Sequence, residues 1–230
     1  MKYFLSSSRF AILSGLLLVL NISSPAYPQI TLNNPDPSLN AFAIDVSVQS
    51  GSVINGVPIN VPPGINGIQP QINLIYSSNQ TQGILGVGWF LEFGAIERSL
   101  KFGTPGYDSS DVFVYAQNGG KTDLVFDSQA NFYRSKIEES FMKFTQVSDH
   151  WEAVDRQGTK YFFGSTASAR LADPNDATHV FRWALDRVED VHGNYMTLSY
   201  YKDAAGNQLY PDVVEYTGHT TSPSLTPYAR

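Results

Sequence analysis

Hydrophobic and polar residues alternate with a period of two in several short segments of this chain. The alternation is clear in residues 42–48, 72–76, 181–186 and 196–200. Successive side chains of a strand point to opposite faces of a sheet, so each segment predicts a strand with one buried face. Turn residues separate the segments at intervals of roughly 8–15 residues, which indicates an all-β fold. We predict a multi-stranded antiparallel meander or sandwich-like arrangement with short turns.

A hairpin is predicted in the middle of the chain, where the segments 112–115 and 124–126 flank Asn118-Gly119-Gly120. Asparagine followed by glycine supplies the positive φ angles that a tight turn between antiparallel strands needs.

The segment 136–144 is ambiguous. Ile137, Phe141 and Phe144 have helical spacing, which leaves a short helix and a bulged strand as alternatives. We favour the strand, because the neighbouring segments are strands and the run is short for a helix.

Three stretches share an Asp-x-x-Gly pattern and begin at Asp155, Asp190 and Asp203. An aspartate side chain accepts N–H bonds from the backbone two residues on, and glycine or asparagine adopts positive φ. We therefore interpret each stretch as a turn beside a strand rich in aromatic residues. In the second stretch, Gly193 and Asn194 would complete the turn.

Proline and glycine interrupt the apolar residues between Val57 and Trp89. Proline fixes φ and removes a backbone donor, so this region predicts extended segments and tight turns and excludes a long helix. Gly86-Val87-Gly88 lacks the third glycine and the following helix of a dinucleotide-binding loop. We expect these glycines to let the backbone approach closely where Trp89 packs.

The first 26 residues have the pattern of an export signal. Lys2 and Arg9 supply positive charge, a largely apolar run covers residues 10–20, and Ser24-Pro25-Ala26 offers a cleavage site. This run is shorter than the roughly 20 residues of a membrane-spanning helix, and an uncleaved anchor is the alternative. We expect a secreted, extracellular protein with no membrane span after signal removal, the periplasm being the other destination, and a linker at residues 27–40.

Charge and cysteine content narrow the function classes. Without residues 1–26 the chain has 13 basic residues (15 minus Lys2 and Arg9) and 21 acidic residues, a net charge of −8. Such a surface has no electrostatic footprint for nucleic acid. The sequence has no cysteine, which excludes thiol catalysis and cysteine metal sites. An exported domain of this kind must be stable through its own core.

No set of residues predicts a catalytic, cofactor or metal site, and we predict that the protein is not an enzyme. The acidic residues lack a spacing that would set a glycosidase pair roughly 5–10 Å apart, and the scattered histidines lack zinc-site spacing. Two acidic loops offer oxygen atoms for calcium without the EF-hand pattern, so ordinary Asx-turns are favoured. The acids are Glu138, Glu139, Asp149, Glu152, Glu189 and Asp190, the histidines are His150, His179, His192 and His219, and the loop residues are Asp108, Asp111, Asp173, Asn175 and Asp176.

Aromatic residues raise a second hypothesis, a carbohydrate- or surface-binding β module. Exposed rings would form a platform for sugars, whereas buried rings would form the core and cross-strand ladders. Trp183 alternates in phase with Phe181 and Leu185, which indicates a core position. A hydrolase is the third hypothesis. The rings considered are Trp89, Trp151, Trp183, Tyr107, Tyr115, Tyr133 and Tyr161.

An ordered set of motifs runs through residues 43–218. It includes the runs Val61-Pro62-Pro63-Gly64, Leu85-Gly86-Val87-Gly88-Trp89, Ile96-Glu97-Arg98, Phe181-Arg182-Trp183, His192-Gly193-Asn194 and Glu215-Tyr216-Thr217-Gly218, and its main residues are Pro62, Pro63, Gly64, Gly67, Pro70, Gly86, Gly88, Trp89, Trp183, Asp190, Gly193 and Asn194. The set resembles the family of Salmonella virulence plasmid B proteins and of the B subunits of bacterial insecticidal toxin complexes, with their tyrosine–aspartate (Rhs-type) repeats.

The resemblance implies a β-rich shell segment, which can be an incomplete part of a larger β-cocoon. In toxin complexes of this family, B and C subunits form a cocoon around a toxic polypeptide, and in the Salmonella protein the module precedes an ADP-ribosyltransferase domain. The sequence shows neither propeller repeats nor the Glu-x-Glu pair of such transferases. We therefore expect the N-terminal shell piece at residues 41–218, followed by a flexible tail at 219–230. Its role would be structural, and its partners would be other toxin-complex or Rhs-type polypeptide segments.

Overall fold

A computed structural model of the chain describes residues 45–46, 53–79, 84–117, 120–137, 141–203, 208–221 and 229. These residues form antiparallel β-sheets with a short 3-10 helix at Ala167–Ala169, which confirms the all-β prediction. The predicted signal peptide and linker lie outside the described residues. In the part of the chain that is described, no helix is long and apolar enough to cross a membrane.

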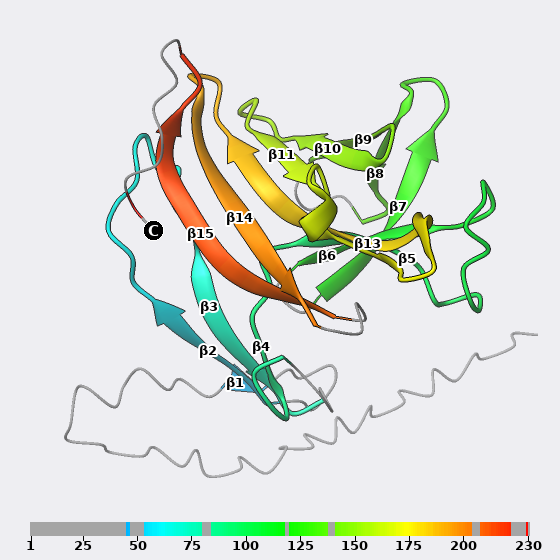
Figure 1. The fold of residues 1–230 in the computed structure, drawn as a ribbon, viewed down its shortest axis with the longest axis horizontal. Coiled ribbons are helices and arrows are strands. Elements are labelled where there is room, and N and C mark those ends of the chain that lie inside the picture. Colours follow the sequence, from blue (N-terminus) through cyan, green and yellow to red (C-terminus); the bar gives the residue numbers. More distant parts are fainter. Residues whose placement is uncertain are drawn as a thin grey trace, which may run out of the picture. The chain divides into compact units, whose positions relative to one another are not determined.

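The smaller sheet contains four strands in sequence order: β1 (Asp45–Val46), β2 (Val53–Ile59), β3 (Ile72–Ser77) and β4 (Trp89–Phe90). Figure 1 shows β2 and β3 side by side in this sheet. The strand predicted from the alternation at 72–76 is therefore confirmed, although every side chain of β3 is half-buried. Of the strand predicted at 42–48, only β1 lies within the described residues.

The larger sheet contains the remaining strands. They are β5 (Ala95–Arg98), β6 (Phe113–Gln117), β7 (Gly120–Asp127), β8 (Phe132–Ser135), β9 (Lys143–Val147), β10 (His150–Val154), β11 (Lys160–Phe163), β12 (Arg170–Asp173), β13 (Asp176–Glu189), β14 (Asn194–Lys202) and β15 (Leu209–His219).

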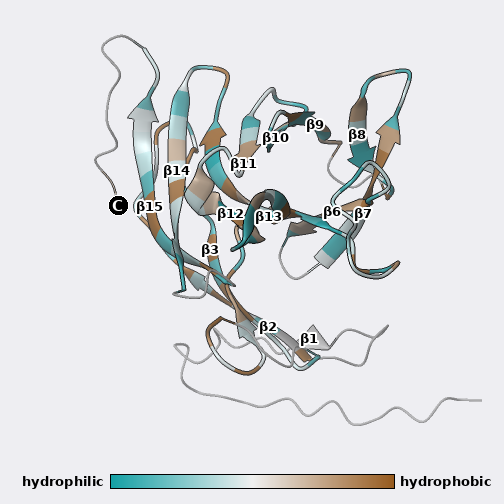
Figure 2. Ribbon diagram, turned by 45° about the vertical axis from the view of Figure 1, so that its right-hand side comes forward, coloured by the Kyte–Doolittle hydropathy of each residue, from teal (hydrophilic) through white to brown (hydrophobic). Residues whose placement is uncertain are grey.

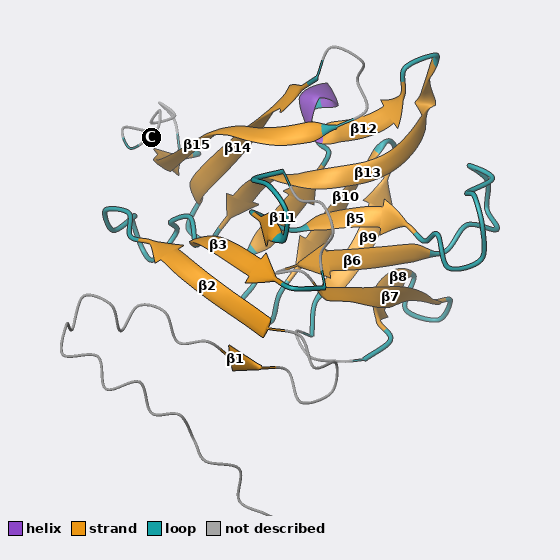
Figure 3. Cartoon of the chain, turned by 90° about the horizontal axis from the view of Figure 1, so that it is seen from below, coloured by secondary structure: helices purple, strands orange, loops and turns teal. Residues whose placement is uncertain are grey.

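Eight of these strands close into a barrel. Strands β5 to β11 follow one another as antiparallel neighbours, and β13 pairs with both β5 and β11. Ile96 faces Trp183 across the β5–β13 pair, and Tyr161 faces Val188 across the β11–β13 pair. Figure 3 shows β13, β5, β6 and β7 side by side in this wall. Closure gives the ring no open edge.

Three strands lie outside the ring. β12 pairs with the first half of β13, and β14 and β15 continue the sheet from its second half. In Figure 2, hydrophobic and hydrophilic bands alternate along β14. Leu198 is buried and Met196 and Tyr200 pack against the core, which confirms the strand predicted at 196–200.

Side chains fill the barrel, as expected for a ring of about eight strands. The largest fully buried side chains are those of Trp151, Phe144, Phe163 and Ile96. The ring of Phe113 lies with its centroid 4.8 Å from that of Trp151 in an edge-to-face arrangement. Such pairs contribute about 0.5–1.5 kcal/mol beyond the burial of apolar area.

Strand β13 contains a bulge that the alternation did not reveal. Leu171 faces Arg182 but the next pair is Ala172 with Val180, so Phe181 is an extra residue in β13. Val180 is therefore buried in the core with Trp183, whereas Phe181 is half-buried outside it. The core position predicted for Trp183 is confirmed, and the prediction that Phe181 lies in phase with it is wrong because of this bulge.

One end of the barrel is closed by a buried ion pair, which we call the barrel floor. Nη1 of Arg98 lies 2.5 Å from Oδ2 of Asp111, and both side chains are less than a tenth exposed. The guanidinium also lies over the ring of Phe113, with 5.2 Å to the centroid, and its Nε donates to the carbonyl of Val180. We call the opposite end, where β5 begins and β6 ends, the barrel mouth.

The local predictions are resolved as follows. Strands β6 and β7 pair as the predicted hairpin, with the turn residues 118–119 outside the description. Lys143 and Phe144 belong to β9, which supports the strand interpretation of 136–144, while residues 138–140 are not described.

The Asp155 and Asp190 turns form as predicted. Gly158 has φ +84° and Gly193 has φ +86°. Oδ1 of Asp155 accepts from the backbone of Gln157, as the Asx-turn interpretation requires. The third predicted turn falls mainly on undescribed residues.

Candidate functional site

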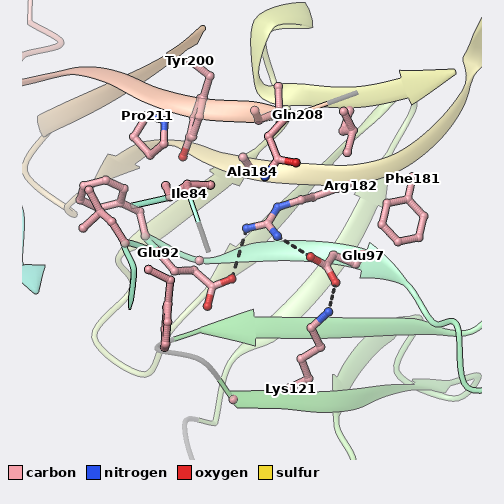
Figure 4. A pocket seen from close by; sticks show the side chains of 17 residues that line it. Ile84, Glu92, Glu97, Lys121, Phe181, Arg182, Ala184, Tyr200, Gln208 and Pro211 are labelled. Atoms are coloured by element: carbon pink, nitrogen blue, oxygen red, sulfur yellow. Dashed lines mark hydrogen bonds and ion pairs between the residues drawn. The ribbon is translucent and has the colours of Figure 1, made fainter. Parts of the chain in front are cut away.

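The pocket shown in Figure 4 lies against the outer face of the barrel wall. Glu97 and Arg182 face each other across β5 and β13, and their neighbours Ile96 and Trp183 point into the barrel. Because side chains alternate along a strand, the two charged residues point outward. The cavity holds about 320 Å³, and its apolar lining comprises Ile84, Phe90, Leu91, Phe93, Leu171, Phe181, Ala184, Leu209 and Pro211.

Four charged side chains form a connected network in this pocket. Nη1 of Arg182 lies 2.5 Å from Oε1 of Glu97, and Nζ of Lys121 lies 2.5 Å from Oε2 of the same carboxylate. Nη2 of Arg182 lies 3.2 Å from Oε1 of Glu92. The side chain of Glu97 is only 4% exposed, so its charge must be compensated locally. Two cations and two carboxylates leave this network without net formal charge.

Tyr200 borders the pocket beside this network. Its hydroxyl donates to the carbonyl of Leu185 at 2.6 Å. Burial raises the pKa of Tyr200, Arg182 opposes this increase, and Asp186 and Glu92 add to it. The phenol therefore keeps its proton and acts as a hydrogen-bond donor.

The arrangement suits binding through shape and apolar contact. The charged groups are paired with one another, and apolar side chains surround them. A ligand here would gain mostly from burying apolar surface next to a fixed polar network.

Several residues of the sequence motifs meet at a different place, the junction between the smaller sheet and the β13–β14 turn. Oδ2 of Asp190 accepts from Nδ2 of Asn66 at 2.8 Å and from Nδ2 of Asn194 at 2.7 Å, and its Oδ1 accepts from the backbone of His192 and Asn194. Burial would raise the pKa of Asp190, but these hydrogen bonds outweigh it and lower the pKa to about 2. The hydroxyl of Tyr216 donates to the carbonyl of Pro62 at the same junction.

Gly64 and Gly88 lie where neighbouring atoms leave no room for a Cβ atom. A Cβ atom at Gly64 would lie 2.0 Å from the carbonyl oxygen of Ile68, and one at Gly88 would lie 2.5 Å from the ring of Tyr76. The ring of Tyr76 also packs against Trp89, with centroids 5.4 Å apart, so the close approach expected at Trp89 is present.

The remaining motif residues are spread over the fold. Gly67 and Gly86 have positive φ, Pro70 is buried, and Pro63 is exposed. Trp183 lies in the barrel core, where its Nε1 donates to the carbonyl of Asp149. The motifs thus mark turns, close contacts and core positions and do not gather in one pocket.

The acidic residues considered for catalysis are dispersed. Asp149 pairs with Arg170, and this hydrogen bond lowers the pKa of Asp149. Glu189 pairs with Arg187 on the same strand. Glu152 lies near His150, Asp190 holds the junction, and Glu138 and Glu139 are not described.

The histidines and acidic loops do not converge either. Among the described residues, no group of three or more His, Cys, Asp or Glu side chains is placed to hold a metal ion. His179 stacks on Tyr107, with ring centroids 4.4 Å apart. Three of the loop aspartates accept hydrogen bonds from the backbone two residues on, as the Asx-turn interpretation requires; they are Asp108, Asp173 and Asp176. Asp111 pairs with Arg98, and Asn175 donates to Asp173. Nδ1 of His219 accepts from Thr221.

The aromatic residues considered for a sugar platform belong mostly to the core. Trp151, Trp183 and Tyr115 are less than a tenth exposed, and Tyr133 and Tyr161 pack against them. The seven rings therefore do not form one exposed platform.

Sequence reasoning did not predict the charged pocket. Glu97 and Arg182 were recognised only as parts of motifs, and Glu92 and Lys121 were not singled out. A charged residue directly beside a core residue within a strand, as Glu97 beside Ile96, is the signal that would have indicated an outward-facing charged residue.

The family comparison covers most of the chain. The model of the family described as SpvB, Salmonella virulence plasmid 65kDa B protein, matches residues 47–223. Mono(ADP-ribosyl)transferase SpvB of Salmonella choleraesuis (strain SC-B67) is 28% identical over 218 residues, which cover 83% of this chain and 36% of the relative. The protein of the same name from Salmonella enteritidis is 28% identical over 61% of this chain and 28% of its own length. The chain thus spans about a third of the length of these curated relatives.

Solved structures share the fold. The N-terminal domain of effector protein SpvB from Salmonella typhimurium strain LT2 has a TM-score of 0.60 and 23% identity, over 76% of this chain and 69% of that domain. The crystal structure of TcdB2-TccC3 has a TM-score of 0.63 and 22% identity, over 76% of this chain and 10% of that chain. The Photorhabdus luminescens Tc holotoxin pore gives 0.64 and 20%, with the same coverages.

These comparisons correct one expectation and confirm another. The prediction that the protein is not an enzyme is contradicted by its curated relatives, which are named mono(ADP-ribosyl)transferases and of whose length this chain spans about a third. The resemblance inferred from the order of the motifs is confirmed. The chain belongs to the toxin-related family of the Salmonella virulence plasmid 65kDa B protein.

Proposed function

We propose that this domain is a shell segment of a virulence or toxin-type protein and that it packs against other toxin-complex or Rhs-type polypeptide segments. One observation carries the proposal: the chain shares its fold over 76% of its length with a segment that makes up 10% of the TcdB2-TccC3 chain. A segment of a much larger chain needs surfaces that contact the rest of the assembly, and apolar surface next to fixed polar groups is typical of such contacts.

The pocket beside Arg182 is the surface we propose for this contact. Phe181 is half-buried at its border, outside the barrel core, because of the bulge in β13. A partner segment that covers Phe181, Leu171 and Leu209 would bury apolar area without breaking the ion pairs of Glu97. Buried aromatic anchors of this kind carry much of the binding energy of interfaces.

Cross-linking in the native host tests this proposal. We expect the tagged protein to be recovered in a complex with a toxin-complex or Rhs-type polypeptide, and Phe181→Asp to reduce that recovery at least about tenfold, the equivalent of 1.4 kcal/mol. Val125→Asp is the control, because Val125 is an exposed apolar residue of β7 that does not line the pocket. Recovery as a monomer, or equal losses in both variants, contradicts the proposal.

The proposed location is extracellular or periplasmic. The pattern of residues 1–26 supports export, since it combines basic residues, an apolar run and small residues in the order of a cleaved signal.

Mono(ADP-ribosyl) transfer is a second candidate function, favoured by the names of the curated relatives. It is proposed for the polypeptide that carries this domain, because the chain spans about a third of those relatives. Incubating the polypeptide that carries this domain with labelled NAD and host-cell proteins tests it: transfer of label supports the activity, and no transfer contradicts it.

A further inference from the structure

The barrel mouth contains a second and larger cavity, of about 540 Å³. Its walls come from the ends of β6, β11 and β13, from β14 and from the segment that leads into β5, and residues 66–73 lie across it. The cavity thus combines the top of the barrel core with the Pro- and Gly-rich segment of the sequence.

Tyr115 lines this cavity. The residue is 8% exposed, and its ring packs against those of Phe144 and Phe163, with centroids 5.1 Å and 6.0 Å away. Among the described residues, its hydroxyl has no hydrogen-bond partner, although residues around it line the cavity. Burial, together with Tyr161 and Glu92, raises the pKa of Tyr115, so the phenol is a neutral donor. A phenol that lines a cavity can donate a hydrogen bond to a ligand held there.

The other polar groups around the cavity are mostly uncharged. Gln71, Asn73 and Gln117 offer carboxamides, and Thr159 offers a hydroxyl. The lining contains no Lys, Arg or His side chain, and Glu92 contributes a carboxylate. Carboxamides and hydroxyls both donate and accept hydrogen bonds. This set matches a ligand that carries several neutral groups of the same kind, and it disfavours anions.

Part of the cavity lining is apolar. Phe93, Leu185, Val188 and Met196 provide carbon surface below the polar rim. A purely apolar ligand would leave the polar lining groups without hydrogen bonds, and a fully polar ligand would not bury the apolar lining. A sugar ring has both hydroxyl groups and an apolar C–H face. The cavity volume is in the range of small-molecule sites, roughly 300–1,000 Å³.

We propose that the barrel mouth binds a neutral mono- or disaccharide unit, with the hydroxyl of Tyr115 donating from below and the carboxamides of Gln71, Asn73 and Gln117 bonding at the rim. A cavity at the end of a barrel fits a compact ligand better than an extended peptide, which would need a long groove or a free sheet edge.

Calorimetric titration of the full chain tests the proposal. The probes are neutral hexoses, N-acetylhexosamines and their disaccharides, with glucuronate as the anionic comparison and a Gly/Ser peptide as the peptide comparison. We expect at least one neutral sugar to bind and Tyr115→Phe to weaken it about tenfold, the loss of one hydrogen bond. Glucuronate should bind more weakly than the matching neutral sugar.

Tyr133→Phe is the matched control, because Tyr133 packs against Phe113 and does not line the cavity. It should bind the sugar as the parent protein does. Tyr115→Phe should keep the parent's melting temperature, because the Tyr115 hydroxyl has no hydrogen-bond partner among the described residues. Absence of binding by every neutral sugar, equal affinity of Tyr115→Phe, or binding of the peptide alone would overturn the proposal.

Discussion

At residue 193 the backbone adopts φ +86°, and a Cβ atom there would lie 2.3 Å from Oγ1 of Thr220. Glycine alone adopts this conformation without strain. We expect Gly193→Val to lower the free energy of unfolding by about 1–3 kcal/mol, as measured by urea denaturation. Gly56→Ala is the control, since a Cβ atom at Gly56 would meet nothing within 4 Å. Similar midpoints for both variants would count against the strained turn.

Asp190 makes stability depend on pH. Its pKa in the folded protein, about 2, is lower than the ordinary value of 3.8, so the carboxylate stabilises the fold fully above the unfolded-state pKa and loses this contribution as the pH falls toward 2. We expect Asp190→Asn to lower stability at neutral pH by about 1.5–3 kcal/mol and to flatten the profile between pH 4 and pH 2. Unfolding curves across this range measure both effects. Asp173→Asn, in an exposed Asx-turn, should leave the profile unchanged.

Asp190 makes hydrogen bonds to residues near it in the sequence and to one residue far from it, and only the near ones could be predicted. Its bonds to His192 and Asn194 follow from Asx-turn chemistry over a few residues and were predictable. Its bond to Asn66 joins residues 124 positions apart and depends on the docking of the smaller sheet. The turn at Asp190 could therefore be predicted from the sequence, whereas its contact with Asn66 could not.

At the scale of elements, the barrel floor depends on one buried ion pair. Arg98→Met would leave the carboxylate of Asp111, which is 8% exposed, without its cation. We expect this variant to lose about 3–5 kcal/mol of unfolding free energy. Thermal and urea unfolding provide the measurement.

The double variant Arg98→Met/Asp111→Leu is the control for this prediction. It removes both charges and should be more stable than Arg98→Met alone, because no unpaired charge stays buried. A double variant that is less stable than the single one would show that the charge is not what destabilises Arg98→Met.

The positions of strands were the most predictable feature, and which of their side chains face the core was less predictable. The period of two identified β3, β13 and β14. The burial of side chains varies along β13 and β14, whereas every side chain of β3 is half-buried. The bulge at Phe181 shifted the phase of β13, and a bulge is determined by the partner strand β12 as much as by the sequence of β13.

At the scale of the whole molecule, ring closure and the charged pocket share one cause that the sequence did not reveal. Both require β13 to meet β5, which brings Arg182 to Glu97 across 85 positions. A sequence pattern within one segment does not predict a pairing between strands so far apart in the chain. The order of motifs nevertheless identified the family, because it samples turns and core positions over the full domain.

Export is a prediction about the whole chain. We expect deletion of residues 1–26 to retain the protein in the cytoplasm, because the basic residues and apolar run that resemble a signal are removed. Cell fractionation and immunoblotting measure the distribution. Deletion of the predicted linker, residues 27–40, should leave secretion intact. A full-length protein that stays in the cytoplasm would refute the signal assignment.

The pairing of Ile96 with Trp183 has a kinetic consequence. During synthesis at roughly 5–20 residues per second, β5 waits several seconds for its partner, and both β5 and β11 have an unsatisfied side until β13 emerges. Domains dominated by such distant contacts fold slowly. We expect a nascent chain of this design to stay unfolded until β13 has emerged, which would suit the proposed export, and to gain from a chaperone that prevents aggregation in that interval.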